Sequence, residues 1–131
     1  MKINISSIPV ADQDDALQFY TEILGFEKKT DFPAGEYRWL TVVSPEEPDA
    51  TQLALEPNVH PATQAYQAAL LADGIPISTF EADDLIAEVA RLENLGVKFT
   101  TQPVDVGTAM IAVFDDSCGN LIQLYETKSP V

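Results

Sequence analysis

Residues 111–126 read IAVFDDSCGNLIQLYE, an apolar run, a short polar turn and a second apolar run. Asp, Gly and Asn favour tight turns, and β-forming residues flank them, so this stretch predicts a β-hairpin. Side chains on its second strand alternate between the two faces of the sheet. Leu121, Gln123 and Tyr125 share one face, and the residues between them are expected to pack on a helix. A glutamine and a tyrosine beside a leucine indicate an enclosed face that also contacts something polar, so the search for a site begins there.

The composition is that of a globular protein with a strong negative charge. The chain has 131 residues, of which 46% are hydrophobic and 21% charged, which is enough for one domain with a core. Asp and Glu number 21 against 7 Lys and Arg, which gives a formal net charge of −14. This charge repels phosphate backbones and anionic headgroups, so we expect no nucleic acid and no membrane partner. Its main expected effect is solubility.

The cysteine content and the apolar runs indicate a cytoplasmic protein. No apolar run approaches the roughly 20 residues that a membrane-spanning helix needs, and the first residues do not resemble a signal peptide. The single cysteine, Cys118, cannot form an internal disulfide, which agrees with a reducing compartment. A catalytic thiol needs a histidine partner, and the one histidine, His60, falls in a predicted loop or helix start. Cys118 is therefore interpreted as a turn residue.

Periodicity predicts three helices and eight strands. Asp12 is expected to cap a first helix that ends at Gly25, and Asp83 or Asp84 a later one that ends at Gly96. An Ala- and Gln-rich helix is predicted between them. It covers residues 61–72, and the strands cover residues 2–10, 26–32, 37–43, 52–56, 77–82, 97–101, 109–114 and 121–126.

The order of elements repeats, as strand, capped helix, Gly and three strands. One offset aligns residues 10–12 with 81–83, Ala16 with Ala87, and residues 24–26 with 95–97. A βαβββ half cannot close a core alone, so two halves are expected to curve their sheets around a shared cavity, within one chain or in a domain-swapped dimer. We predict one α+β domain of two βαβββ modules, residues 1–57 and 74–131, joined by a short helical linker, residues 58–73.

Three stretches carry a resemblance to a known family. They are IPVADQDDALQFYTEILGFE (residues 8–27), FEADDLIAEVARLENLGVKF (residues 80–99) and FDDSCGNLIQLYE (residues 114–126). On them the chain resembles the vicinal oxygen chelate superfamily, which contains glyoxalase I, bleomycin-resistance proteins and extradiol dioxygenases. The resemblance implies the paired βαβββ fold of that superfamily over essentially the whole chain. It leaves the function open, because members include lyases, isomerases, dioxygenases, thiol transferases and binding proteins.

The resemblance also implies where a metal ion would bind in a metal-dependent member. The corresponding positions are Ile5, Ala54, Ile77 and Gln123. Ile and Ala have no donor atom, and one neutral amide cannot hold a divalent cation against water, so we expect no metal and no other cofactor. The alternative is a metal site rebuilt from Glu56, His60 and Glu126, which would require a one-residue register shift to turn Glu126 inward.

Strand alternation gives a set of candidate ligand-binding residues on the face opposite the helices. Alternation does not decide which face of the third strand points inward, and Trp39 and Thr41 are included on the resemblance. An aliphatic wall with a few amides, hydroxyls and one indole suits a small, partly apolar molecule. Simple core filling is the alternative, above all for Ile5, Ala54 and Ile77. The candidates are Ile5, Ser7, Trp39, Thr41, Gln52, Ala54, Glu56, Ile77, Thr79, Gln123 and Tyr125.

Two functions are expected from these observations, and no catalytic residue is identified. The first is metal-independent binding of a small, partly apolar organic molecule, similar to that of bleomycin-resistance proteins. The alternative is a glyoxalase-like lyase or isomerase acting on a small carbonyl substrate, with Glu56 or Glu81 as a base or with a recruited metal. A scaffold whose own side chains fill the cavity is a third, weaker hypothesis. The superfamily's habit of pairing sheet edges makes a homodimer the expected assembly.

Overall fold

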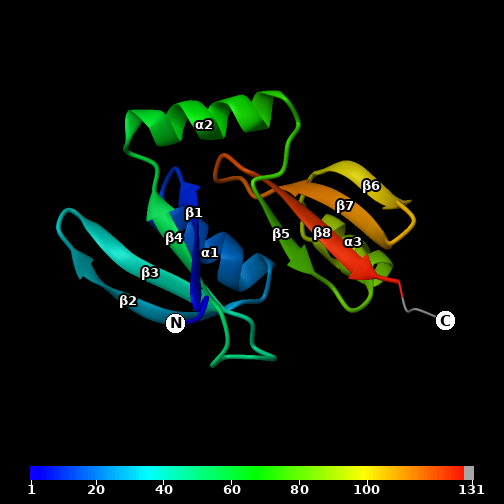
Figure 1. Ribbon diagram of the computed structural model, residues 1–131, viewed down its shortest axis with the longest axis horizontal. Coiled ribbons are helices and arrows are strands. Elements are labelled where there is room, and N and C mark those ends of the chain that lie inside the picture. The colour runs from blue at the N-terminus through cyan, green and yellow to red at the C-terminus, as the bar shows by residue number, and fades with distance from the viewer. Residues whose placement is uncertain (129–131) are drawn as a thin grey trace. The chain divides into compact units, whose positions relative to one another are not determined.

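The computed structural model describes residues 1–128 and contains two four-stranded sheets and three α-helices within them (Figure 1). The chain divides into two compact units, Met1–Tyr66 and Gln67–Val131. The first unit contains β1 (Ile5–Val10), α1 (Gln13–Gln18), the π-helical turn η1 (Phe19–Ile23), β2 (Glu27–Ala34), β3 (Tyr37–Val43) and β4 (Gln52–Pro57). Helix α2 (Pro61–Ala72) spans the boundary between the units. The second contains β5 (Ser78–Glu81), α3 (Leu85–Asn94), β6 (Phe99–Asp105), β7 (Ala109–Asp115) and β8 (Leu121–Thr127).

The two sheets have the same strand order. In the first it is β1-β4-β3-β2, and in the second it is β5-β8-β7-β6. The pairs β1–β4 and β5–β8 are parallel, and all the others are antiparallel. This repeated order confirms the predicted α+β fold class and the hairpin at β7–β8. The assignment of residues 1–57 and 74–131 to modules joined by residues 58–73 stays a prediction.

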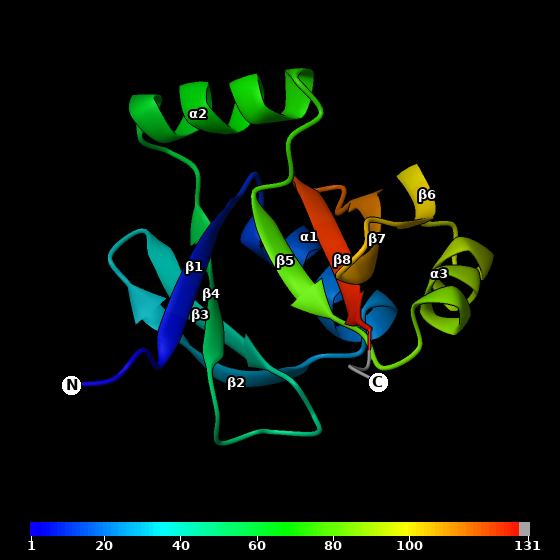
Figure 2. The same ribbon diagram turned by 45° about the vertical axis from the view of Figure 1, so that its right-hand side comes forward.

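Each unit builds a core between one face of its sheet and its helix. Helix α1 packs on β4, and α3 packs on β6, β7 and β8, as Figure 2 shows for α3. The predicted alternation on β8 is confirmed, because Ile122 and Leu124 are buried on the side of α3. Burial of a large apolar side chain stabilises a fold by about 1.5–3 kcal/mol. The first unit buries Ile8, Val10, Ala16, Tyr20, Leu40, Val42 and Leu55, and the second buries Leu85, Val89, Leu92, Ala112, Phe114, Ile122 and Leu124.

The two helices are capped by aspartates, but not at positions related by the predicted offset. Asp12 accepts a hydrogen bond from the Asp15 amide at 2.9 Å, and Asp84, not Asp83, accepts one from the Ala87 amide at 3.1 Å. Gly25 and Gly96 end the helical segments with φ of +92° and +89°. The first helical segment is therefore one residue longer than the second, and the alignment of residues 10–12 with 81–83 is wrong by one. A π turn adds one residue to a helix, and η1 supplies it.

Several strand ends also differ from the prediction. β1 begins at Ile5, so Ile3 precedes the strand and is 89% exposed. β2 continues through Pro33 to Ala34, where a turn had been expected. Proline is tolerated there because β2 is an edge strand, and its missing N–H costs no ladder hydrogen bond. β5 begins at Ser78, so Ile77 lies just before it.

Candidate functional site

Strand register identifies the residues on the face of the first sheet opposite α1, which we call the first helix-free face. Directly opposed residues point to the same side of a sheet. Ala54 is opposed by Ser7 on β1 and by Thr41 on β3, and Thr41 is opposed by Thr30 on β2. The row therefore crosses all four strands. It also places Trp39 with Thr41, because the two are separated by two residues on one strand.

A chain of three polar side chains lies along this face. The Thr41 hydroxyl is 2.6 Å from the Thr30 hydroxyl and donates a hydrogen bond to Gln52 Oε1 at 2.8 Å. Thr41 is 0% exposed, so its hydroxyl depends on these two partners. Because the Gln52 oxygen accepts from Thr41, the amide nitrogen is directed away from Thr41. Gln52 Nε2 forms no hydrogen bond with any residue that the structure describes, and it remains a donor.

Apolar side chains surround this chain and are only partly covered. Ile5 is opposed by Gln52 and is 43% exposed. Phe32 is opposed by Trp39 and is 52% exposed, whereas Trp39 itself is half-buried. Glu56 is exposed and opposed by Pro9. The resulting face combines an aromatic pair, an aliphatic group and an amide donor.

The basic residues of the first sheet do not belong to this face. Arg38 forms ion pairs with Asp14 on α1 and with Asp31, and Lys28 is 3.6 Å from Asp31, so all three side chains lie on the helix side. Hydrogen bonding from Arg38 holds the pKa of Asp31 below its ordinary value. Lys29 lies in the β2 bulge and binds Asp49 at 3.3 Å.

Gln13 fixes the spacing of β3 and β4, and the sequence analysis did not identify it. The residue pairs of these strands end at Thr41 and Ala54. Beyond them, Gln13 Nε2 donates to the carbonyls of Arg38 at 2.7 Å and Leu55 at 2.9 Å, while its Oε1 accepts from the Arg38 amide at 3.1 Å. One side chain thus replaces a ladder rung directly beside Trp39 and Glu56. Its position three residues before the buried Ala16 was the available signal.

The second helix-free face, opposite α3, carries Thr79, Gln123 and Tyr125. Gln123 is opposed by Thr79 on β5 and by Val113 on β7, and Tyr125 by Glu81 and Ile111. Gln123 and Tyr125 are half-buried, and Thr79 is exposed. Within residues 1–128, the Gln123 side chain has no hydrogen-bond partner. The register thus brings Thr79, Gln123 and Tyr125 to one face as predicted, with Ile77 bonded through its amide to the Leu121 carbonyl at 2.9 Å.

Two of the three residues of the alternative metal site serve helix starts instead. Glu126 Oε1 accepts a hydrogen bond from the Leu85 amide at 2.9 Å, which places it on the α3 side of the sheet. His60 Nδ1 accepts one from the Ala62 amide at 3.0 Å at the start of α2. The expectation that these two residues join Glu56 around a metal is therefore wrong. In the part of the chain that is described, no group of three or more His, Cys, Asp or Glu could hold a metal ion.

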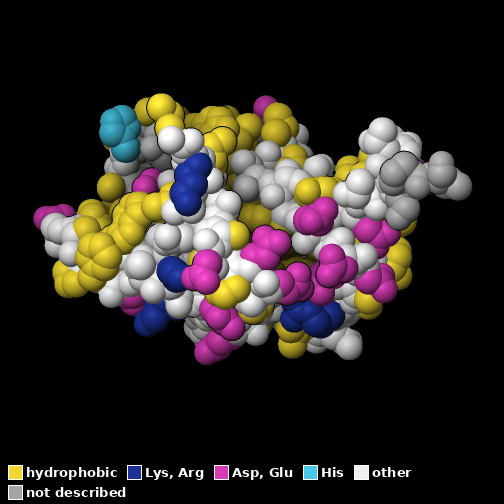
Figure 3. All heavy atoms as spheres, turned by 60° about the horizontal axis from the view of Figure 1, so that its bottom comes forward, with side chains coloured by type: hydrophobic (Ala, Val, Ile, Leu, Met, Phe, Trp, Pro, Cys, Tyr) yellow, Lys and Arg dark blue, Asp and Glu magenta, His cyan; other side chains and the backbone are white. Residues whose placement is uncertain are grey.

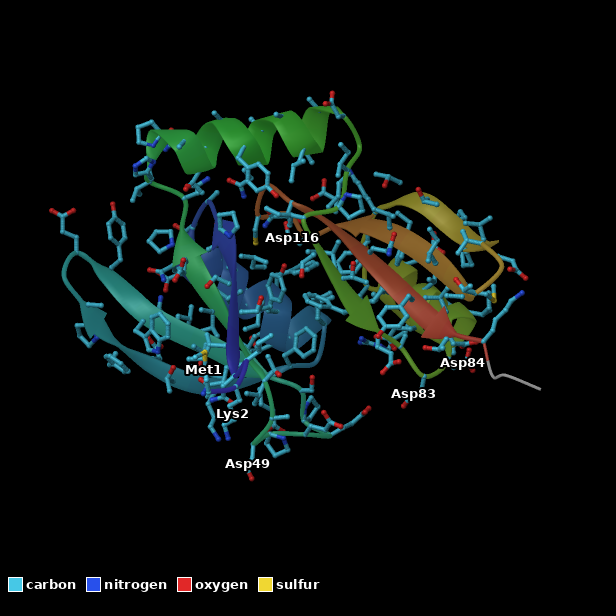
Figure 4. The ribbon with its side chains drawn as sticks, in the orientation of Figure 1. Met1, Lys2, Asp49, Asp83, Asp84 and Asp116 are labelled. Atoms are coloured by element: carbon cyan, nitrogen blue, oxygen red, sulfur yellow. The ribbon has the colours of Figure 1, made fainter. Side chains whose placement is uncertain are left out.

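The turn between β7 and β8 contains a buried polar network, around Asp116 in Figure 4. Asp116 is 0% exposed and accepts hydrogen bonds from the Cys118 amide and from the Asn120 amide and side chain, at 2.8–3.0 Å. Gln67 on α2 donates to Asn120 Oδ1 at 2.9 Å. A Cβ on Gly119 would lie 2.8 Å from Gln67 Nε2, so only glycine fits there. Cys118 is a buried turn residue, as predicted.

Acidic side chains are prominent on the molecular face shown in Figure 3, with few basic ones among them. Strands β5 to β8 contain no lysine or arginine. Together with the placement of Lys28, Lys29 and Arg38, this leaves both helix-free faces without a basic strand residue. No helix within residues 1–128 is long and apolar enough to cross a membrane.

The repeated βαβββ order and the two helix-free faces define a protein of the paired-module class. The family model of the Glyoxalase/Bleomycin resistance protein/Dioxygenase superfamily matches residues 2–124, and the chain belongs to this superfamily. The family resemblance drawn from the three sequence stretches is thereby confirmed.

Known relatives differ in what their names state. The chain is 53% identical to the uncharacterized protein YurT of Bacillus subtilis (strain 168) over 126 residues, covering 96% of this chain and 99% of the relative. It is 30% identical to a probable lactoylglutathione lyase of Synechocystis sp. (strain ATCC 27184 / PCC 6803 / Kazusa), covering 93% and 92% of the two chains. Among solved structures, TnmS3, an antibiotic binding protein from Streptomyces sp. CB03234, is similar with a TM-score of 0.78 and 29% identity, covering 98% of this chain and 97% of that one.

Proposed function

We propose that this protein binds a small, partly apolar organic molecule on its helix-free sheet faces, without a metal ion, as bleomycin-resistance-type proteins do. The observation that carries the proposal is the first helix-free face. Partly exposed Ile5, Phe32 and Trp39 lie there beside an amide donor, in a protein whose surface is otherwise strongly acidic. Apolar side chains grouped with a few polar groups are typical of ligand sites. The similarity to the antibiotic binding protein TnmS3 supports the same function.

The absence of donor atoms at the family's metal positions supports metal independence. Ile5, Ala54 and Ile77 offer only carbon, and Gln123 offers one neutral amide. A divalent cation needs several carboxylate or imidazole ligands to displace its water. The ligand would be held instead by apolar contact and by hydrogen bonds from the candidate side chains.

Trp39 is the single tryptophan and lies on the proposed face, so its fluorescence reports directly on ligand binding. A panel of planar aromatic antibiotics is titrated into protein that has been treated with EDTA and dialysed. We expect saturable quenching with the same Kd before and after treatment. Quenching that appears only when Ni, Zn, Mn or Fe is added back would contradict metal independence. No quenching or calorimetric binding by any compound would contradict the binding function.

A lyase or isomerase is the second candidate, because of the similarity to a probable lactoylglutathione lyase. Glu56 and Glu81 are exposed on strands, and Glu81 accepts a hydrogen bond from the Thr127 hydroxyl at 3.3 Å. Either carboxylate could remove a proton from carbon in a suitable substrate. The test is turnover of methylglyoxal with glutathione, with and without added divalent metal. Turnover that is lost in Glu56→Gln or Glu81→Gln would favour this candidate over simple binding.

A cytoplasmic homodimer completes the proposal. β1 and β2 are the edges of the first sheet and β5 and β6 those of the second, and unpaired edges favour association between copies. The lone buried cysteine suits a reducing compartment. Light scattering after size-exclusion chromatography should give twice the chain mass of 14.3 kDa, and a mass of one chain at micromolar concentration would contradict the dimer.

A further inference from the structure

The orientation of the Gln52 amide is fixed by its neighbours. A free glutamine amide can present either its oxygen or its nitrogen to a ligand, because it can rotate by half a turn. In this protein the Thr41 hydroxyl donates to Gln52 Oε1, and Thr41 is itself bonded to Thr30. Rotation of the amide would place two N–H groups against Thr41 and disrupt this chain. Gln52 therefore presents a donor, not an acceptor, to a bound molecule.

The charges around Gln52 add a second restriction. Glu56 lies on the same face of β4, and Glu27 is opposed by Val43 at the other end of β3. The basic groups of the sheet are engaged elsewhere, Lys28 and Arg38 with Asp31, and Lys29 with Asp49. An anionic ligand on this face would meet carboxylates and no basic strand residue that could compensate its charge.

We propose that the first helix-free face selects uncharged or cationic aromatic compounds that carry a carbonyl-type oxygen, with Gln52 as the donor and Thr41 as the residue that orients it. This inference rests on the proposed binding function and specifies its ligand. Phe32 and Trp39 supply the aromatic contact, and Gln52 accepts only ligands with an acceptor in reach. The same selection disfavours glutathione-derived substrates, which carry carboxylates.

Three matched probes test the ligand class. Fluorene has no acceptor, 9-fluorenone adds a carbonyl oxygen, and 9-fluorenone-2-carboxylate adds a negative charge. Their affinities are measured by equilibrium dialysis against the whole protein. We expect fluorenone to bind about 2- to 10-fold more tightly than fluorene, which is the effect of one net hydrogen bond. We expect the carboxylate to bind at least about 10-fold more weakly than fluorenone.

Four variants test the roles of the residues. In Gln52→Leu the fluorenone preference should fall to about 1-fold while fluorene still binds, and Gln123→Leu, on the other sheet, should keep the preference. Thr41→Val should also lose the preference although Gln52 is present, and Thr41→Ser, which keeps the hydroxyl, should restore it. A purely structural role of Thr41 would weaken both neutral probes equally and leave their ratio unchanged. Circular dichroism verifies that each variant is folded.

The outcomes separate this inference from the function on which it rests. Equal affinity of wild-type protein for all three probes would overturn the selectivity but leave small-molecule binding intact. A preference that persists in Gln52→Leu and disappears in Gln123→Leu would assign the donor to the other sheet and overturn the roles of Gln52 and Thr41. Failure of every probe and of the antibiotic panel to bind would overturn both proposals together.

Discussion

The two sheets have the same strand order, but they place their polar groups differently. Ala54 and Gln123 occupy corresponding positions, each opposed by the parallel edge strand and by the antiparallel neighbour. That neighbour is Thr41 in the first sheet and Val113 in the second. The first sheet carries its amide two residues away, at Gln52, and ties it to a hydroxyl, whereas the second leaves Gln123 beside a valine. The backbone arrangement is repeated, and the chemistry of the face is not.

The helix sides differ in the same way. In the first unit, Gln13 at the start of α1 reaches into the sheet and joins β3 to β4. In the second, Glu126 on β8 reaches out of the sheet and caps the Leu85 amide of α3. Both arrangements attach the helix start to the sheet, but only the first controls the spacing of the strands that carry the proposed ligand face. The first sheet is therefore the one built to hold a fixed geometry.

The largest expected effect concerns the turn of the second unit, which has no counterpart in the loop between β3 and β4. Asp116→Ala removes three hydrogen bonds from a buried carboxylate, and we expect a loss of about 3–5 kcal/mol in the free energy of unfolding. Asp115→Ala, which removes one exposed bond to Ser117, should cost less than about 1 kcal/mol. Denaturant titration gives both values. Similar losses in the two variants would contradict the importance of the buried network.

Gln13→Leu tests the corresponding feature of the first unit. It leaves the Arg38 amide and the Leu55 carbonyl without their partner, so we expect a loss of about 2–3 kcal/mol. Hydrogen exchange should show faster exchange in β3 and β4, with β7 and β8 unchanged. Gln18→Leu, on the exposed side of α1, is the control and should be nearly neutral. Equal loss of protection in both sheets would show that Gln13 does not act locally.

Glu126→Ala tests the helix attachment in the second unit. We expect a loss of about 1 kcal/mol, the usual cost of a lost N-terminal cap, with earlier exchange of the first amides of α3. Glu126→Gln should keep most of the stability, because its amide oxygen can still accept from Leu85. A gain of stability in Glu126→Ala would mean that the carboxylate is not a cap.

The smallest effect is the pH dependence of the Arg38–Asp31 pair. Its folded pKa lies below the ordinary value of 3.8, so the pair stabilises the fold above that pH and ceases to do so as the pH falls through the lowered pKa. Wild-type protein should therefore exceed Asp31→Asn in stability near neutral pH, and the difference should vanish in strong acid. Glu36→Gln, in an exposed turn, is the control. A difference that grows with acidity would refute the sign.

The sequence sufficed for the elements whose signals are local. Turn residues and strict alternation predicted the β7–β8 hairpin and the side of Ile122 and Leu124 correctly. The face of β3 was undecided, because Arg38, Leu40 and Val42 are no more clearly apolar than the residues between them. Register with β4 decides it, and register depends on long-range pairing. Gln13 was missed because no local pattern shows where two strands separate. The ligand-binding residues as a set stay a prediction.

The π turn in the first unit has a consequence for protein engineering. It absorbs an additional residue within one helical turn, and both flanking strands still reach the same positions as their counterparts. Segments exchanged between the two halves should therefore be cut outside residues 12–25 and 84–96, because a cut inside them would rotate the remaining helix by about 100° and expose its apolar side. The position of one surplus residue thus determines which recombinants of this fold can be expected to form.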